Sequence, residues 1–244
     1  MKTPLLVFAI AVLSPSMALA QSSGNFTYST NAHSVTACTL NEHGNISGGH
    51  QCVQRCNINS SGVSSCTPAS GVCTGMAVAG IKTNSGNGNV FVVRPSAVVG
   101  LLTDVTVSSK QSGSSTGPVS SSALAGAAFQ VTVTGPGNPQ VIPSYGITYD
   151  SRYIQISTNL FQALATQCAS ITGGCFITFD ESTVSAHSFD WLVTNLSSGT
   201  YTVTTTWKDT LAGSGISESL VCVGPVNMTV QQNKVFSFNT VNSL

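Results

Sequence analysis

Eight cysteines are the residues of this chain with the clearest potential for chemistry. Five lie within residues 38–73, and three lie after residue 167. An even number of cysteines in a chain destined for an oxidising compartment indicates disulfide bonds. Because each group is odd, complete internal pairing requires at least one bridge between the two groups. The predicted disulfide cysteines are Cys38, Cys52, Cys56, Cys66, Cys73, Cys168, Cys175 and Cys222.

The spacing of the later cysteines favours one local bridge. Cys168 and Cys175 flank the short, turn-forming stretch 169–174, which ends in two glycines, so we expect these two to pair. Cys222 is then the expected long-range partner of the N-terminal group. The remaining connectivity stays open, because eight cysteines allow 105 complete pairings.

A metal site is the alternative use of the first cysteine group. Cys52 and Cys56 have a spacing close to a zinc pattern, and His33, His43 and His50 lie in or beside the group. No second pair of ligands follows at the spacing of a zinc finger. Thiols in an oxidising compartment form disulfides. We therefore predict disulfides, no metal site and no cofactor.

The acidic residues are the candidates for hydrolytic chemistry. Asp180 and Glu181 are adjacent, and in a strand they would point to opposite faces. Glycoside hydrolysis would need two carboxyl groups about 5–10 Å apart, which distant acids could still provide across a sheet. The simpler interpretation is that these acids are solvated. The set is Glu42, Asp104, Asp150, Asp180, Glu181, Asp190, Asp209 and Glu218.

Known catalytic motifs give no assignment in the sequence. S-x-x-K, H-E-x-x-H and the phosphate-binding P-loop are absent, and the one G-x-S-x-G match, residues 113–117, lies in a Ser/Gly-rich stretch expected to be a loop. His187 precedes an expected strand and is interpreted as a structural donor or a surface residue. Arg94 and Arg152 are expected to pair with nearby acids such as Asp150, Asp180 or Asp190. The sequence therefore assigns no catalytic residue, and a non-enzyme is favoured over an enzyme.

Residues 1–20 have the layout of a secretory signal peptide. Lys2 is their only charge, an apolar run extends from Leu5 to Leu13, and Ala18 and Ala20 are small residues placed for cleavage before Gln21. The run is shorter than the about 20 residues that span a bilayer. No later segment is long and apolar enough to do so. We expect a secreted or periplasmic protein without a transmembrane segment after cleavage.

The composition after cleavage argues against charged partners. Without Lys2 the chain has seven basic and eight acidic residues, so its net charge is near −1. Nucleic acids and anionic membrane surfaces attract proteins through clustered basic residues. This chain gives no electrostatic reason to expect either partner.

The pattern along the chain predicts a fold in two parts. Residues 21–80 form a disulfide-rich, loop-rich segment, and residues 81–244 contain many short strands separated by polar turns, which predicts an all-β, two-sheet sandwich of immunoglobulin-like or jelly-roll order. One short helix is expected at 158–168, and residues 195–199 are short enough to connect a hairpin. The strands are expected at 25–28, 89–94, 103–107, 128–134, 144–149, 152–156, 175–180, 189–194, 201–207, 220–223, 226–230 and 235–238.

These features lead to two hypotheses for function. The first is an exported, non-catalytic sandwich with a binding, adhesion or envelope-structural role toward an unidentified extracellular ligand or surface. The alternative is an exported hydrolase that acts on polysaccharide or cell wall through a carboxylate pair.

Overall fold

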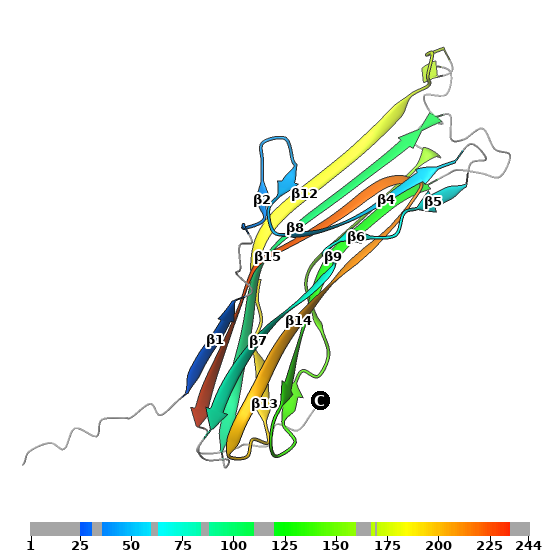
Figure 1. Ribbon diagram of the computed structural model, residues 1–244. Helices are drawn as coiled ribbons and strands as arrows, with labels where there is room; N and C mark the ends of the chain where they lie inside the picture. The colour runs from blue at the N-terminus through cyan, green and yellow to red at the C-terminus, as the bar shows by residue number, and fades with distance from the viewer. Residues whose placement is uncertain are drawn as a thin grey trace, which may run out of the picture.

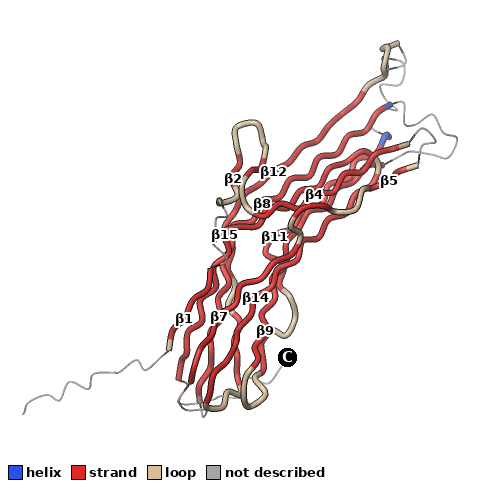
Figure 2. The backbone as a smooth tube through the Cα atoms, viewed as in Figure 1, coloured by secondary structure: helices blue, strands red, loops and turns tan. Residues whose placement is uncertain are grey.

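The computed structural model describes residues 25–30, 36–59, 63–83, 88–109, 120–159, 167–168 and 170–234. Within these residues the protein is an all-β sandwich, elongated along its longest strands (Figures 1 and 2). The predicted fold class is therefore confirmed. The predicted signal peptide at 1–20 and the predicted strand at 235–238 lie outside the described residues.

The larger sheet is built around two long neighbouring strands, β8 (Asn89–Ser108) and β15 (Ile216–Lys234). On the side away from the other long strand, each of these two pairs with two shorter strands that lie end to end. β12 and β13 pair with β8, and β4 and β1 pair with β15. Their bounds are β12 (Phe176–Ser188), β13 (Trp191–Thr194), β4 (His50–Ile58) and β1 (Phe26–Thr30). The outermost strands are β10 (Gln140–Ile142), β5 (Ser64–Cys66) and β6 (Ser70–Gly71).

The smaller sheet has four antiparallel strands in the order β11–β9–β14–β7. A separate pair, β2 (Thr39–Leu40) with β3 (Ile46–Ser47), packs on the outer face of the larger sheet through Ile46 and Leu220. The four strands are β7 (Thr74–Thr83), β9 (Ser120–Thr134), β11 (Ile147–Ser157) and β14 (Gly199–Ser214).

Two gaps between expected strands are wrong. Gly100 lies between the strands expected at 89–94 and 103–107, yet β8 runs through it without interruption. A Cβ at this position would lie 3.2 Å from both Ile46 and Val184, so the glycine allows these two side chains to pack closely against β8. The break expected near residue 225 is only a register shift in β15 between Val223 and Val226.

The predicted hairpin at 195–199 is also wrong, because β13 and β14 belong to different sheets. The Tyr201 hydroxyl holds this crossing: it accepts a hydrogen bond from Ser197 N at 2.7 Å and lies 2.8 Å from Pro136 O. Asn195 Nδ2 donates to Asn138 O at 2.9 Å. A short connection suits a hairpin or a crossing equally well, so these contacts, which join distant segments, decide between them.

The predicted helix at 158–168 falls mostly on residues 160–166, which lie outside the described part of the chain. Gln167 and Cys168 are helical. The helix therefore remains a prediction over most of its length.

The core changes character along the sandwich. Toward the end that contains β13, large aromatic side chains fill the space between the sheets, among them Trp191, Tyr201 and Phe91. Toward the end that contains β5, small residues replace them. A Cβ on Gly213 would lie 2.6 Å from Ser217 Oγ and 2.9 Å from Cys56 Sγ. The packing around Gly213 at the β5 end therefore leaves no room for a side chain.

All eight cysteines form disulfides. The local pair Cys168–Cys175 and the long-range bridge from Cys222, which joins Cys38, confirm the expectations from spacing and parity. The other bridges are Cys52–Cys73 and Cys56–Cys66. Strands β1, β4 and β7, from the disulfide-rich part of the chain, are built into the two sheets. Four disulfides are compatible with an oxidising compartment.

Two glycines of β7 make a matched test of this packing. A Cβ on Gly75 would overlap the Trp207 indole, whereas a Cβ on Gly80 would meet no atom within 4 Å. We expect Gly75→Ala to lower the free energy of unfolding by about 2–3 kcal/mol, because a rigid buried ring must move. Gly80→Ala should change it by less than about 1 kcal/mol. Urea denaturation of both variants checks this, and equal losses would contradict the packing at Gly75.

Candidate functional site

Three acids gather on the outer face of the larger sheet. Asp180 on β12 is in register with Asp104 on β8, which is in register with Glu218 on β15. Glu218 is in turn opposite Arg55 on β4. Directly opposed residues of antiparallel strands have side chains on the same face, about 5 Å apart at Cβ. We call Asp180, Asp104 and Glu218 the carboxylate row.

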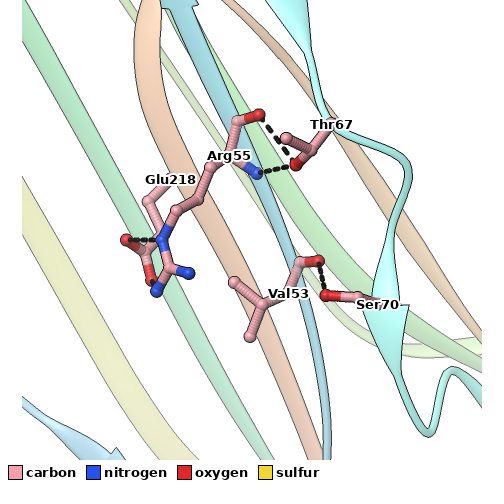
Figure 3. A network of polar contacts seen from close by, with 5 residues as sticks. All are labelled: Val53, Arg55, Thr67, Ser70 and Glu218. Atoms are coloured by element: carbon pink, nitrogen blue, oxygen red, sulfur yellow. Dashed lines mark hydrogen bonds and ion pairs between the residues drawn. The ribbon is translucent and has the colours of Figure 1, made fainter.

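The neighbours of Asp104, the middle acid of the carboxylate row, influence its pKa. Partial burial, followed by repulsion from Asp180 and Glu218, raises the pKa of Asp104 above its ordinary value. Glu218 is instead neutralised, because Arg55 Nε and Nη2 each donate to one of its carboxylate oxygens at 2.8 Å (Figure 3). The uncompensated charge therefore lies on the Asp180 and Asp104 side.

The backbone of Arg55 is held by hydrogen bonds to Thr67. Its backbone N donates to Thr67 Oγ1 at 3.3 Å, and Thr67 Oγ1 donates to Arg55 O at 3.1 Å. Two residues away along β4, Ser70 Oγ donates to Val53 O at 3.5 Å (Figure 3). The segment after β5 therefore holds β4 in place beside Glu218.

A pocket of about 130 Å³ opens between these side chains. Pockets that take drug-sized ligands are about 300–1,000 Å³, so this one accommodates only a small group. Its lining consists of Arg55, Cys56, Asn57, Asp104, Thr106, Ile216, Ser217 and Glu218.

Asp180 and Glu181 point to opposite faces, as predicted. Asp180 belongs to the carboxylate row, whereas Glu181 Oε2 lies 3.5 Å from Arg152 Nε on β11 of the smaller sheet. The predicted pairing of Arg152 with an acid is therefore confirmed with Glu181 as the partner.

A second polar cluster lies between β11 and β12. Ser185 Oγ lies 2.6 Å from His187 Nε2, and Asp150 Oδ2 lies 3.8 Å from the same ring nitrogen. In a serine–histidine–acid triad the serine and the acid contact different ring nitrogens. This cluster lacks that arrangement. Together with the Arg152 contacts it joins the edges of the two sheets, in agreement with a structural role for His187.

A third feature lies on the outer face of the larger sheet, toward the β13 end. Ile142, Leu192, Val92, Gln231 and Phe26 come from five adjacent strands and stand in one register row. Ile142 is 52% exposed, Leu192 45% and Phe26 61%. The row crosses the sheet at this end, from β10 through β13, β8 and β15 to β1. We call these five residues, with Tyr28, the apolar belt.

Tyr28 extends the apolar belt into the next register row. It is 70% exposed, and its ring centroid lies 6.5 Å from that of Phe26. The same row contains Arg94, which donates to both carboxylate oxygens of Asp190 at 2.6 and 2.7 Å. Hydrogen bonding to Arg94 lowers the pKa of Asp190. The charges beside the belt therefore cancel, and the predicted pairing of Arg94 is confirmed.

The histidines of the first cysteine group do not converge. His43 Nε2 lies 3.6 Å from Glu42 Oε1, the His50 ring lies 5.8 Å from that of Trp207, and His33 is outside the described residues. Across the described ranges, no three His, Cys, Asp or Glu side chains are grouped to hold a metal ion. Nor does that part of the chain contain a helix long and apolar enough to cross a membrane.

The apolar belt was not predicted from the sequence. Its residues are separated by up to 205 positions, from Phe26 to Gln231, and only strand pairing brings them together. The alternation of Phe26 and Tyr28 in a short strand was the one signal that could have indicated an exposed aromatic face. In comparisons with known proteins, no family model matches the chain, and no curated protein matches it at a significant level of similarity.

Proposed function

We propose that the protein is exported through its predicted signal peptide and is a non-catalytic sandwich that binds an uncharged extracellular polymer through the apolar belt. The observation that carries the proposal is one register row across five strands, in which Ile142, Leu192 and Phe26 are exposed and apolar, Val92 is apolar and half-buried, and Gln231 is exposed, polar and uncharged. Contiguous exposed apolar surface is unusual on soluble proteins and marks interaction sites.

The cancelled charges around the apolar belt favour an uncharged ligand. Arg94 and Asp190 neutralise each other, and the polar residues of the two register rows, Gln231 and Thr229, are uncharged. Such a surface offers apolar contact and hydrogen bonds without attraction for ions. Neutral polysaccharide combines apolar ring faces with hydroxyl groups, so it fits this surface better than a charged polymer does.

Removal of the two aromatic rings tests the proposal. We expect Phe26→Ala/Tyr28→Ala to weaken binding to the neutral glycans that retain the wild-type protein by at least about tenfold, because exposed rings supply much of such contacts. Glycan arrays and pull-downs on insoluble neutral polysaccharides provide the measurement.

Phe176 and Phe179 provide a matched control, since both are exposed aromatic residues on β12, outside the apolar belt. Phe176→Ala/Phe179→Ala should bind like the wild type. Equal binding by all three proteins, or no wild-type binding to any neutral glycan, would contradict the proposal.

The alternative proposal, an exported hydrolase acting on polysaccharide or cell wall, is favoured by the carboxylate row. Asp104 and Asp180 are neighbouring acids, and Asp104 has a raised pKa, as a general acid requires. Hydrolysis that disappears in Asp104→Asn and persists in Asp190→Asn would support this alternative. Absence of hydrolysis by the wild type across cell-wall and neutral polysaccharides would eliminate it.

A further inference from the structure

Asp209 on β14 is a buried acid without a partner. The residue is 8% exposed, and its side chain lies on the inner face of the smaller sheet, in the alternation that also buries Trp207. Neither carboxyl oxygen has a hydrogen-bond partner among the described residues. An isolated charge in an apolar interior is strongly unfavourable, so the neutral carboxylic acid is the form that this position accepts.

The backbone of Asp209 makes a specific contact between separate parts of the fold. Its N–H donates to Cys73 O at 2.9 Å, and Cys73 is bridged to Cys52 on β4. Asp209 therefore lies where β14 meets the segment between β6 and β7. A change in its charge acts directly on this contact.

Few titratable groups face Asp209. On β4, His50 shares the inner face, and its ring lies 5.8 Å from that of Trp207. Among the described residues, β9 contains no titratable side chain, and the inward residues of β7, β8 and β15 near this level are uncharged. Lys208 is exposed on the other face of β14, and Glu218 lies on the outer face of the larger sheet. Asp150 on β11 stands in the same register row of the smaller sheet, beyond Ala127 of β9, and His187 Nε2 lies 3.8 Å from Asp150 Oδ2. The titration of His50, Asp150 and His187 must therefore be separated from that of Asp209.

We propose that Asp209 makes the contact between β14 and the Cys73 segment responsive to pH: the contact is closed while the carboxyl group is protonated, and it opens when the group ionises. The Cys52–Cys73 bridge keeps the segment tethered, so the opening is local and reversible. Regions of low local stability are those that open under native conditions.

The direction of the response follows from proton linkage. Burial raises the pKa of Asp209 to about 7, against an ordinary value of 3.8. Between these pH values the open form binds fewer protons than the closed form, so opening becomes easier as the pH rises. The protection of the contact is complete below about pH 4 and is lost as the pH rises through about 7. Between pH 5 and pH 8 the opening equilibrium constant should rise about a hundredfold.

Hydrogen exchange of the Asp209 amide measures this opening, because that amide donates to Cys73 O. After correction for the intrinsic exchange rate, we expect protection in the wild type to fall about a hundredfold from pH 5 to pH 8. Asp209→Asn should show no such fall, since its side chain carries no titratable proton. His50→Gln, Asp150→Asn and His187→Gln should each retain the wild-type response, which separates these groups from Asp209.

A carboxyl-carbon NMR titration of the wild-type protein provides a readout that does not depend on any variant. The Asp209 carboxyl signal should titrate near pH 7. Titration below pH 5, or a wild-type pH response in folded Asp209→Asn, would overturn the proposal. If Asp209→Asn does not fold, the titration of the wild type decides alone.

Discussion

Replacement of both Cys38 and Cys222 by alanine is expected to lower the free energy of unfolding by about 5 kcal/mol, the largest effect of any disulfide in this protein. The bridge joins residues 184 positions apart, so it removes more freedom from the unfolded chain than the other three do. It also holds the β2–β3 pair on the outer face of the larger sheet, where Ile46 packs with Leu220.

The Cys168–Cys175 bridge is the matched control, since its sequence separation is only 7. In the chain-entropy model the stabilisation grows with the logarithm of loop length, so Cys168→Ala/Cys175→Ala should cost about 3 kcal/mol less than Cys38→Ala/Cys222→Ala. Denaturant unfolding of the two variants under identical conditions gives the comparison. Equal losses would show that loop entropy does not explain the stabilisation.

Phe129→Ala is expected to lower the free energy of unfolding by about 3–5 kcal/mol. Phe129 is 0% exposed, and its ring centroid lies 4.2 Å from that of Tyr149 and 6.2 Å from that of Trp207. Truncation removes buried apolar surface, leaves a cavity between the sheets and abolishes these ring contacts. The cavity cannot close easily, because continuous strands in both sheets hold its walls.

Phe179 provides the control for Phe129, because the same side chain is 51% exposed on β12. Phe179→Ala should change the free energy of unfolding by less than about 0.5 kcal/mol. Calorimetry or urea denaturation measures both variants. A loss below about 1.5 kcal/mol for Phe129→Ala would contradict the view that the aromatic residues form the centre of this core.

Local patterns sufficed for several elements. Phe129, Val131 and Val133 alternate with polar residues, and the structure places them on the inward face of β9. The parity of the cysteines required a bridge between distant groups, and Cys38–Cys222 supplies it. The adjacency of Asp180 and Glu181 placed their side chains on opposite faces. In each case a count or a two-residue period carried the information.

Local patterns gave wrong predictions where the same short stretch of sequence is compatible with two backbone paths. Residues 195–199 fit a hairpin by length, yet the Tyr201 hydroxyl and Asn195 fix a crossing between sheets through contacts with Pro136 and Asn138. Gly100 suggested the end of a strand, although its lack of a side chain accommodates Ile46 from the β2–β3 pair. These outcomes depend on segments more than 50 residues away in the chain.

The sequence by itself determined the all-β class, the disulfide cysteines and the need for a long-range bridge, because composition, period and parity are properties of the chain alone. Only the tertiary structure decided which side chains meet. The carboxylate row, the apolar belt and the burial of Asp209 each depend on strand order and register between β-strands that are far apart in the chain. Register has no local signature, since a shift of one residue exchanges the two faces of a strand without altering its pattern.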